Sequence, residues 1–376
     1  MHDPRNDKLA NIIVNHSLEL KKGEKVLIQG TGFDSEPLVR AIVKASKAIG
    51  ALPVYKFENQ ETIREWLKDA SPEMLELAAK TDAYQMKMMD AYVGFTAPEN
   101  NMELSDLPVE TMRMYMEKYN SPVHMKIRLP HTKWVVLRYP TSAFAQSAEM
   151  SGEEFEDWFY NVCTVDYKKM GRAMEPLKAL MEKTDKVRIL GPGETNLSFS
   201  IKGIPVIPCA GELNLPDGEI YTAPVKESVN GIIAYNTSSI HDGFKYTDIR
   251  FRFEKGKLVE ATANDNKRIN LVLDIDEGAR YVGEFAIGVN PYVDRPVNST
   301  LFDEKIRGSI HFTPGNSYDD AFNGNKSALH WDIVLLQEEQ NGGGEIWFDD
   351  VLIRKDGRFI LPELEGLNPE NLSQPG

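Results

Sequence analysis

Two histidines and an aspartate in the last third of the chain have the side-chain types of a metal site. In "SALHWDIVL", His330 and Asp332 lie two positions apart on an expected strand, so both side chains point to one face while Trp331 points to the other. His311 lies earlier, in "RGSIHFTPG", at the end of another short expected strand. Because His-x-Asp is a common pattern, these residues fit a polar surface loop as well as a set of metal ligands.

Two glutamates extend this set, because an unpaired carboxylate would be costly among their neighbours. Glu219 follows a Pro-Asp-Gly turn in "NLPDGEIYTAP", and Glu284 lies between glycine and phenylalanine in "YVGEFAIGVNP". A buried charge needs a partner of opposite sign. Two glutamates, two histidines and an aspartate can hold two adjacent divalent ions that prefer nitrogen and oxygen, such as zinc, cobalt or manganese. One carboxylate can bridge both ions and leave positions open for water.

Other motifs give weaker indications of chemistry. The turn "QGTGFDSEP" follows an expected strand and opens an expected helix, as in a dinucleotide fingerprint, but Ser35 occupies the third glycine position. "GPGET" lacks the lysine and hydroxyl pair of a phosphate loop, so both segments are interpreted as turns. Cys163 and Cys209 have no histidine nearby in the sequence and no G-x-S-x-G motif occurs, which favours buried small side chains over nucleophiles. No organic cofactor site is predicted.

The segments around the candidate ligands resemble the metal-dependent aminopeptidase family typified by aminopeptidase T and aminopeptidase S. "NLPDGEIYTAP", "GEFAIGVNP", "KIRGSIHFTPGNSY" and "GNKSALHWD" are similar to the successive catalytic-domain motifs of that family, in the same order. In the first half of the chain, "KKGEKVLIQG", "GALPVYKFEN" and "VVLRYPTSAFAQSAEMSGEEFE" also resemble it, so the likeness covers nearly the whole sequence. The resemblance implies a homodimeric enzyme that hydrolyses the N-terminal residue of peptides.

The resemblance also implies a role for each candidate residue. The ligands of two divalent ions would be Glu219, Glu284, His311, His330 and Asp332, with Glu284 as the bridging carboxylate. Tyr318, in the "GNSY" motif, would donate a hydrogen bond to the tetrahedral intermediate. A carboxylate beside the metals would move a proton to the leaving amine, and Glu219 is a candidate for this role as well as for metal binding.

Two other functions remain open. Ring-cleaving dioxygenases of dihydroxypyridine catabolism resemble the same family in fold and would use one Fe(II) on a His/His/Asp set. Such an enzyme does not need both glutamates, so Glu219 and Glu284 favour the dinuclear peptidase. A metal-binding protein without catalysis is the third alternative, and the presence of Tyr318 beside the five ligands argues against it. The chain is shorter than typical aminopeptidases of the family, which leaves the substrate range open.

The composition excludes several classes of protein. The chain has 376 residues, of which 41% are hydrophobic and 27% charged, as in ordinary globular proteins. With 43 basic and 57 acidic residues the net charge is −14, and no basic run occurs, so neither nucleic acid nor an anionic membrane is an expected partner. Two cysteines are too few for a disulfide framework, and neither a secretory signal nor a membrane span is expected. These features predict a cytoplasmic protein.

The elements that must position these residues indicate an α/β protein of two domains, as the length suggests. Over residues 1–185, strands at 25–30, 51–58, 90–97 and 134–140 alternate with helical patterns, and Ser35 and Pro37 are placed to start the first crossover helix. This alternation predicts an open α/β domain with a parallel sheet. Over residues 186–376, short strands alternate with Gly, Asn, Asp and Pro turns, with 265–281 as the main helical segment. The second domain is therefore predicted to be β-rich, of the α+β type, and catalytic.

Overall fold

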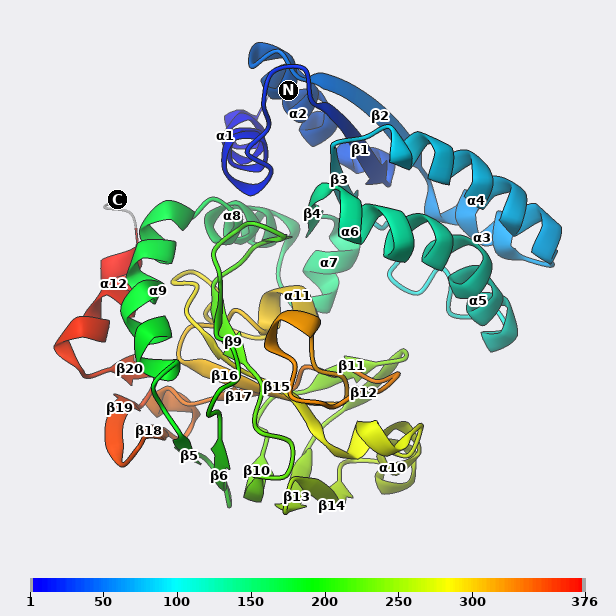
Figure 1. The fold of residues 1–376 in the computed structure, drawn as a ribbon. Helices are drawn as coiled ribbons and strands as arrows, with labels where there is room; N and C mark the ends of the chain where they lie inside the picture. The colour runs from blue at the N-terminus through cyan, green and yellow to red at the C-terminus, as the bar shows by residue number, and fades with distance from the viewer. Residues whose placement is uncertain (1–2, 374–376) are drawn as a thin grey trace. The chain divides into compact units, whose positions relative to one another are not determined.

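A computed structural model describes residues 3–373, and internal contacts divide the chain into two units. The first unit comprises Met1–Thr164 and Gly211–Leu215, and the second comprises Val165–Ala210 and Pro216–Gly376. This division falls before the predicted change at residue 186, because helix α9 (Tyr167–Met181) packs against strand β7 and the turn η7 (Pro362–Leu367) of the second unit. Each unit has its own sheets, which confirms the predicted mixture of a parallel and an antiparallel part (Figure 1).

The first unit is built on a sheet in the order β2-β1-β3-β4-β8, in which every neighbouring pair is parallel. The strands are β1 (Lys25–Thr31), β2 (Leu52–Glu58), β3 (Ala91–Thr96), β4 (Lys133–Arg138) and β8 (Asn214–Leu215). The first four correspond to the strands predicted from the sequence. β8 comes from the later segment 211–215, which returns to pair with β4.

Helices join these strands. They are α1 (Pro4–Ile12), η1 (Ile13–Ser17), η2 (Phe33–Ser35), α2 (Glu36–Ala48), α3 (Gln60–Leu67), α4 (Pro72–Lys87), α5 (Val109–Tyr115), η3 (Met116–Arg128), α6 (Leu129–His131), α7 (Ser142–Ser147) and α8 (Gly152–Cys163). α2 starts where Ser35 and Pro37 predicted. The Ser35 hydroxyl does not cap the helix, however, because it donates a hydrogen bond to the Gly32 carbonyl (2.5 Å).

Two sets of helices cover the two faces of the parallel sheet. Leu27 and Tyr92 share one face, where they pack with buried side chains of α4 and η3. The alternate residues Val26 and Ile28 are completely buried, and α2 contacts both β1 and β2. The alternation of side chains along a strand thus gives the sheet two apolar faces, each of which needs a helical cover.

The paired strands of the second unit are antiparallel to one another, and one isolated parallel bridge joins Asn290 to Ile306. One sheet has the order β14-β13-β10-β6-β5-β18-β19-β20, another β17-β16-β15-β9-β7, and β11 pairs with β12. The strands are β5 (Lys186–Leu190), β6 (Asn196–Ser200), β7 (Ile207–Cys209), β9 (Glu219–Thr222), β10 (Asn230–Ala234), β11 (Ser239–His241), β12 (Phe244–Tyr246), β13 (Arg250–Glu254), β14 (Lys257–Thr262), β15 (Val282–Gly288), β16 (Ser309–Pro314), β17 (Val334–Leu336), β18 (Glu345–Phe348), β19 (Val351–Lys355) and β20 (Arg358–Phe359). Its other helices and helical turns are α10 (Asn266–Leu273), η4 (Glu277–Arg280), α11 (Thr300–Asp303), η5 (Asp319–Ala321), η6 (Glu339–Asn341) and α12 (Pro369–Leu372).

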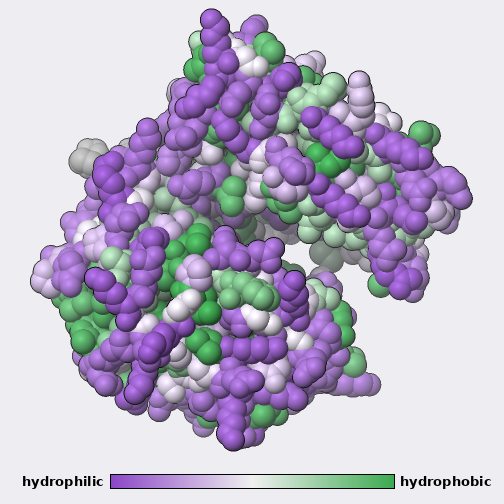
Figure 2. Space-filling view, viewed as in Figure 1, coloured by the Kyte–Doolittle hydropathy of each residue, from purple (hydrophilic) through white to green (hydrophobic). Residues whose placement is uncertain are grey.

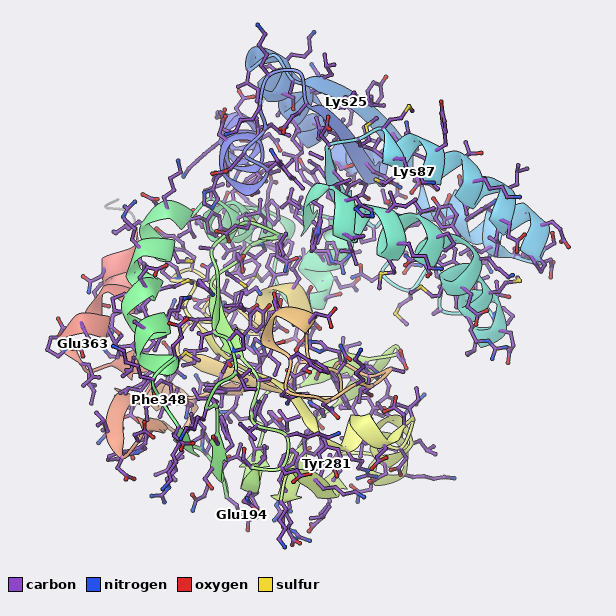
Figure 3. All side chains as sticks on the ribbon, in the orientation of Figure 1. Lys25, Lys87, Glu194, Tyr281, Phe348 and Glu363 are labelled. Carbon is purple, nitrogen blue, oxygen red and sulfur yellow. The ribbon has the colours of Figure 1, made fainter. Side chains whose placement is uncertain are left out.

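The two larger sheets of this unit pack face to face through aromatic side chains. The Phe199 ring of β6 lies 5.0 Å from that of Phe285 and 5.2 Å from that of Phe312, on β15 and β16. Phe348, which is labelled in Figure 3, is buried at the end of β18. The Tyr235 hydroxyl donates to the Phe312 carbonyl at 2.7 Å. This core fixes the backbone of β15 and β16, the strands that carry Glu284 and His311.

The surface agrees with the polar composition. Hydrophilic side chains dominate the face seen in Figure 2, with smaller hydrophobic patches among them. Across residues 3–373, no helix has both the length and the apolar character that crossing a membrane requires. Cys163 and Cys209 are free thiols; Cys163 is fully buried, as predicted for a small apolar side chain, whereas Cys209 is only partly buried.

Candidate metal centre

Three of the five candidate ligands project from one face of the sheet β17-β16-β15-β9-β7. Glu219 opens β9, Glu284 lies in β15, and His311 lies inside β16. The strand register places Ala286 opposite His311, so Glu284 and His311 are diagonal neighbours on the same face. Cross-strand neighbours of this kind are close enough for long side chains to meet. Residues that are far apart in the sequence therefore meet because three strands pair side by side.

The other two ligands come from an extended segment rather than a regular strand. His330 forms an isolated bridge with Gly315, and the next strand, β17, begins only at Val334. The predicted alternation nevertheless holds, because His330 and Asp332 lie side by side while Trp331 is buried on the other side. The Trp331 indole donates to the Ser239 hydroxyl at 2.8 Å, which anchors this segment.

The five side chains form two groups that share Glu284. In the first group, His311 Nε2 lies 2.9 Å from Glu284 Oε1 and 3.6 Å from Glu219 Oε2. In the second, His330 Nε2 lies 3.2 Å from Asp332 Oδ1 and 3.5 Å from Glu284 Oε2. Within each group the potential ligand atoms lie within 4.8 Å of one another. The two oxygens of Glu284 thus face different histidines.

The cluster contains buried carboxylate oxygens that lack a partner. Glu219, Glu284 and His311 are 6%, 3% and 1% exposed. Glu219 Oε2 and Glu284 Oε2 are buried without a hydrogen-bond partner among residues 3–373. Such orphan oxygens are costly in a protein interior. Their positions fit divalent cations, because nitrogen and carboxylate oxygen are suitable ligands for zinc, cobalt and manganese.

The carboxylates of the centre raise the pKa values of both histidines. Burial alone would lower the pKa of His311, but its contacts with Glu284 and Glu219 raise it to about 9. Burial would likewise lower the pKa of His330, yet Asp332 and Glu284 raise it to about 10. Burial raises the pKa of Glu219. Without a metal the carboxylates thus attract protons to the histidines, which a bound cation would displace.

Neighbouring groups orient two of the ligands. His330 Nδ1 lies 2.8 Å from the Asn316 carbonyl, which can only accept, so Nδ1 carries a hydrogen and Nε2 is the ring nitrogen available to bind a metal. The Thr313 hydroxyl donates to Asp332 Oδ1 at 2.7 Å. Asn316 and Thr313 were not predicted from the sequence, since no motif marks a residue that supports a ligand.

Lys305 is the most important residue that the sequence reasoning missed. Its side chain is completely buried, and its Nζ lies 2.6 Å from Glu219 Oε1, 2.9 Å from Glu304 Oε1 and 3.5 Å from Asp217 Oδ1. Burial would lower its pKa, but Glu219, Glu304 and Asp217 raise it well above the usual value. Lysine is normally an exposed residue, so nothing in "LFDEKIRGS" indicates this location.

The Lys305 ammonium also supplies the positive charge for a second group of potential metal ligands. Ligand atoms of Cys209, Asp217 and Glu219 lie within 4.8 Å of one another and have the geometry of a cation site. Lys305 Nζ contacts both carboxylates of this cluster. The positive charge is therefore supplied by the chain itself, and Glu219 keeps only Oε2 for the group that contains Glu284 and His311.

Tyr318 lies at the open side of the centre. Its ring centroid is 4.6 Å from that of His330 and 5.7 Å from that of Tyr221, and the residue is 45% exposed. The more buried residues of the centre are thus accompanied by one phenol that solvent, and hence a substrate, can reach. The structure brings together all six of the residues that the sequence analysis named.

Comparison with known proteins shows which family the sequence matches. The sequence model of the family described as "Thermophilic metalloprotease (M29)" matches residues 2–359. Aminopeptidase T of Thermus thermophilus is 33% identical over a match that covers 35% of this chain and 36% of that protein. Aminopeptidase 2 of Geobacillus stearothermophilus is 24% identical over 94% of each chain.

Solved structures show the same fold. Wild-type AmpT from Thermus thermophilus superposes with a TM-score of 0.81 at 22% identity, over 95% of this chain and 99% of that one. 2,5-Dihydroxypyridine dioxygenase from Pseudomonas putida superposes less well, with a TM-score of 0.61 at 10% identity over 96% and 98% of the two chains. Both likenesses concern the fold, which two different chemistries share.

Proposed function

The chain belongs to the thermophilic metalloprotease (M29) family and is a metal-dependent aminopeptidase, and we propose that it works with two divalent ions. The proposed ligands are the five clustered side chains, Glu219, Glu284, His311, His330 and Asp332. One observation carries this proposal: Glu284 presents Oε1 to His311 and Oε2 to His330, so that each oxygen belongs to a different group of ligand atoms. A carboxylate so placed suits a bridge between two ions better than a ligand of one.

Two ions bound in this way would polarise the scissile carbonyl, activate a water and anchor the free α-amine of a peptide. The chain's own residues prepare the site for them. Burial of Glu219 and Glu284 excludes water from their unpaired oxygens. The Asn316 carbonyl fixes the tautomer of His330, and Thr313 holds Asp332 by a hydrogen bond. The ligands are therefore arranged before any cation arrives.

Tyr318 is proposed to donate a hydrogen bond to the oxyanion of the tetrahedral intermediate. Its ring packs beside His330, and the side chain is partly open to solvent, as a residue that meets the substrate must be. A preorganised donor of this kind stabilises charge that develops in the transition state.

Glu304 is a better candidate than Glu219 for moving the proton to the leaving amine. Lys305 Nζ binds Glu219 Oε1 at 2.6 Å, and Oε2 is the oxygen that remains for a metal beside His311, so Glu219 has no oxygen left for proton transfer. Glu304 shares the ammonium of Lys305 at 2.9 Å and is 12% exposed, so it lies beside the centre without belonging to either ligand group. Glu219 then acts as a ligand only.

The alternative is a mononuclear Fe(II) dioxygenase on the same fold. The dihydroxypyridine enzyme shares the fold, but a His/His/Asp iron site gives no role to the buried oxygens of Glu219 and Glu284. Elemental analysis separates the two, because the peptidase should hold two ions per chain and the dioxygenase one iron.

The decisive test is turnover of aminoacyl-p-nitroanilides by protein reconstituted with zinc, cobalt or manganese. Release of p-nitroaniline should need metal and should stop in Glu284→Ala. Ring cleavage of a dihydroxypyridine with iron, or no release from any aminoacyl substrate with any of the three metals, would contradict the proposal. The same panel would identify the preferred metal and the preferred N-terminal residue.

We also propose a homodimer in the cytoplasm. The resemblance to the aminopeptidase family supports the dimer, and the free thiols of Cys163 and Cys209 support the location. Light scattering checks the assembly, since a stable 42.4 kDa monomer at micromolar concentration would contradict a dimer.

A further inference from the structure

The first unit contains a pocket that the peptidase chemistry does not use. Its volume is about 540 Å³, within the range of small-molecule sites. Gln29 of β1 and Lys56 and Glu58 of β2 form its base, near the carboxyl ends of these two strands. Open α/β sheets bind ligands at the carboxyl ends of their strands. The pocket, which we call the aromatic pocket, therefore lies where this architecture places ligand sites.

Three rings form one wall of the aromatic pocket. Trp66 of α3 stands edge-on to Tyr119, with ring centroids 5.6 Å apart and an interplanar angle of 77°. Tyr115 stacks on Tyr119 at 5.3 Å and is perpendicular to Trp66 at 6.4 Å. Tyr115 and Tyr119 are nearly parallel and Trp66 stands edge-on to both, so the three rings pack together as one aromatic wall. The faces of aromatic rings attract organic ammonium ions because they carry partial negative charge.

A lysine already lies at the polar side of this pocket. Lys56 Nζ is 3.0 Å from Glu58 Oε1 and 3.0 Å from Asp82 Oδ2. Gln29 donates to Glu58 Oε2 at 2.8 Å, and the Tyr119 hydroxyl donates to Asp82. Two carboxylates and one ammonium leave the group with one negative charge. The side chains of Lys56, Glu58 and Asp82 are 32%, 24% and 22% exposed, so a soluble ligand can reach them.

The helix that carries Tyr119 has an unusual conformation. η3 (Met116–Arg128) is a π-helix with Pro122 inside it, and it carries both Tyr119 and His124 into the pocket. π-helical turns occur frequently at functional sites. Arg128 Nε lies 3.2 Å from His124 Nδ1, and burial with this cation lowers the pKa of His124 to about 4. His124 is thus neutral and adds no positive charge to the pocket.

We propose that the aromatic pocket binds an organic ammonium ion with an apolar body the size of a phenylethyl group. The rings of Trp66, Tyr115 and Tyr119 take the body, and the ammonium joins or displaces that of Lys56 beside Glu58 and Asp82. An anionic ligand would meet the net negative charge of this group, and a neutral one would leave it unchanged. The positive charge of the ligand is therefore the feature that the site selects.

The test is calorimetric titration of the full-length, metal-loaded protein with 2-phenylethylammonium, 2-phenylethanol and phenylacetate. We expect the ammonium to bind with a Kd of about 1 mM, as suits a ligand of this size. The alcohol and the anion should bind at least tenfold more weakly, at roughly the cost of one lost charge contact. Asp82→Asn and Trp66→Ala should each weaken binding of the ammonium about tenfold.

Lys56→Met gives the sharpest result, because removal of the internal ammonium should strengthen binding. Lys118→Met is the matched control: Lys118 belongs to η3 and pairs with Glu76 at 2.9 Å, but it does not line the pocket. It should leave the Kd unchanged. Glu58→Gln preserves size and tests the same charge if Asp82→Asn fails to fold.

The metal centre could also attract an amine, so the titration is repeated with Glu284→Ala. Binding that survives in Glu284→Ala and weakens in Trp66→Ala assigns the ligand to the aromatic pocket. Binding that is lost in Glu284→Ala and unchanged in Trp66→Ala would overturn the proposal. It would also be overturned if 2-phenylethanol bound as tightly as the ammonium, or if the ammonium gave no heat at 20 times the expected Kd. None of these outcomes depends on whether the chain cleaves peptides.

Discussion

The metal centre and the aromatic pocket both place a lysine among carboxylates, but they differ in burial. Lys305 is fully buried and contacts three carboxylates, whereas the side chain of Lys56 is 32% exposed and contacts two. In the first region further buried oxygens, on Glu219 and Glu284, have no partner within residues 3–373. In the second, Gln29 and Tyr119 donate hydrogen bonds to the same carboxylates.

This difference determines what each region can exchange. A buried charge interacts strongly and cannot be compensated by water, so Lys305 is a fixed part of the structure and the missing charge must come from bound metal. A half-exposed charge is screened, so the contacts of Lys56 are weak enough for a ligand to replace. The depth of burial therefore separates a structural lysine from a replaceable one.

Glu284→Ala should have the largest effect, because it tests whether the metal centre depends on this residue. Because both ligand groups use an oxygen of Glu284, the variant should lose metal and all detectable peptidase activity. Elemental analysis and p-nitroanilide turnover measure the two losses. Two ions per chain in Glu284→Ala would contradict the bridging role, and Glu345→Ala, at a half-buried position outside the centre, is the control.

Lys305→Met tests whether the buried lysine is fixed. Loss of one partner from a buried charge group typically costs about 3–5 kcal/mol, because the remaining charges stay buried and unpaired. We expect a decrease of this size in the free energy of unfolding, measured with urea in the presence of a chelator. Lys202→Met is the control, since Lys202 is 75% exposed beside Asp185 and should not alter stability. Equal stability of both variants would show that burial does not distinguish the lysines.

Tyr318→Phe should affect only the transition state. Removal of one donor to an oxyanion typically lowers kcat by about 10²- to 10³-fold. Because the phenol is not part of either ligand group, metal content and KM should remain near their wild-type values. A wild-type kcat in Tyr318→Phe would withdraw this role, and loss of metal would make Tyr318 a structural residue of the centre.

His124→Gln should have the smallest effect and concerns the acid sensitivity of the first unit. Burial lowers the pKa of His124 to about 4 from an unfolded value near 6.5, so the folded state resists protonation. Its contribution to stability is complete above about pH 6.5 and is lost as the pH falls toward 4. When the pH falls between these values, the free energy of unfolding of His124→Gln should decrease by about 1–2 kcal/mol less than that of the wild type, after allowance for partial exposure. Urea unfolding at pH 7.5 and pH 4.5 gives the difference, and parallel losses would exclude this role.

Much of the fold could be predicted because its signals are local. The strands β1 to β4 follow from runs of apolar residues, and α2 begins at the start signal formed by Ser35 and Pro37. The boundary between units could not be read in this way. α9 follows helices of the first unit in sequence, yet it packs on β7 and η7, and such packing depends on contacts between distant segments.

The types of the ligands were evident from the sequence, but their grouping was not. Glutamate and histidine beside glycine and apolar residues indicated metal chemistry at Glu219, Glu284 and His311. Pairing of β9, β15 and β16 decided that these residues share a face, and a single bridge from Gly315 to His330 brought the last two beside them. Only this pairing shows that each oxygen of Glu284 meets a different histidine.

The sequence alone determined the class of fold, the resemblance to a peptidase family and the six residues with candidate chemistry. These depend on the types of the residues and on their spacing over short segments, both of which can be read directly from the sequence. The tertiary structure decided the charge balance. Distance and burial decide that Lys305 is the buried partner of Glu219, Glu304 and Asp217 and not a solvated surface residue. They also decide that Lys56 lies partly exposed beside Glu58 and Asp82 in the aromatic pocket. Electrostatic energy is set by these two quantities, and neither is written in the order of the residues.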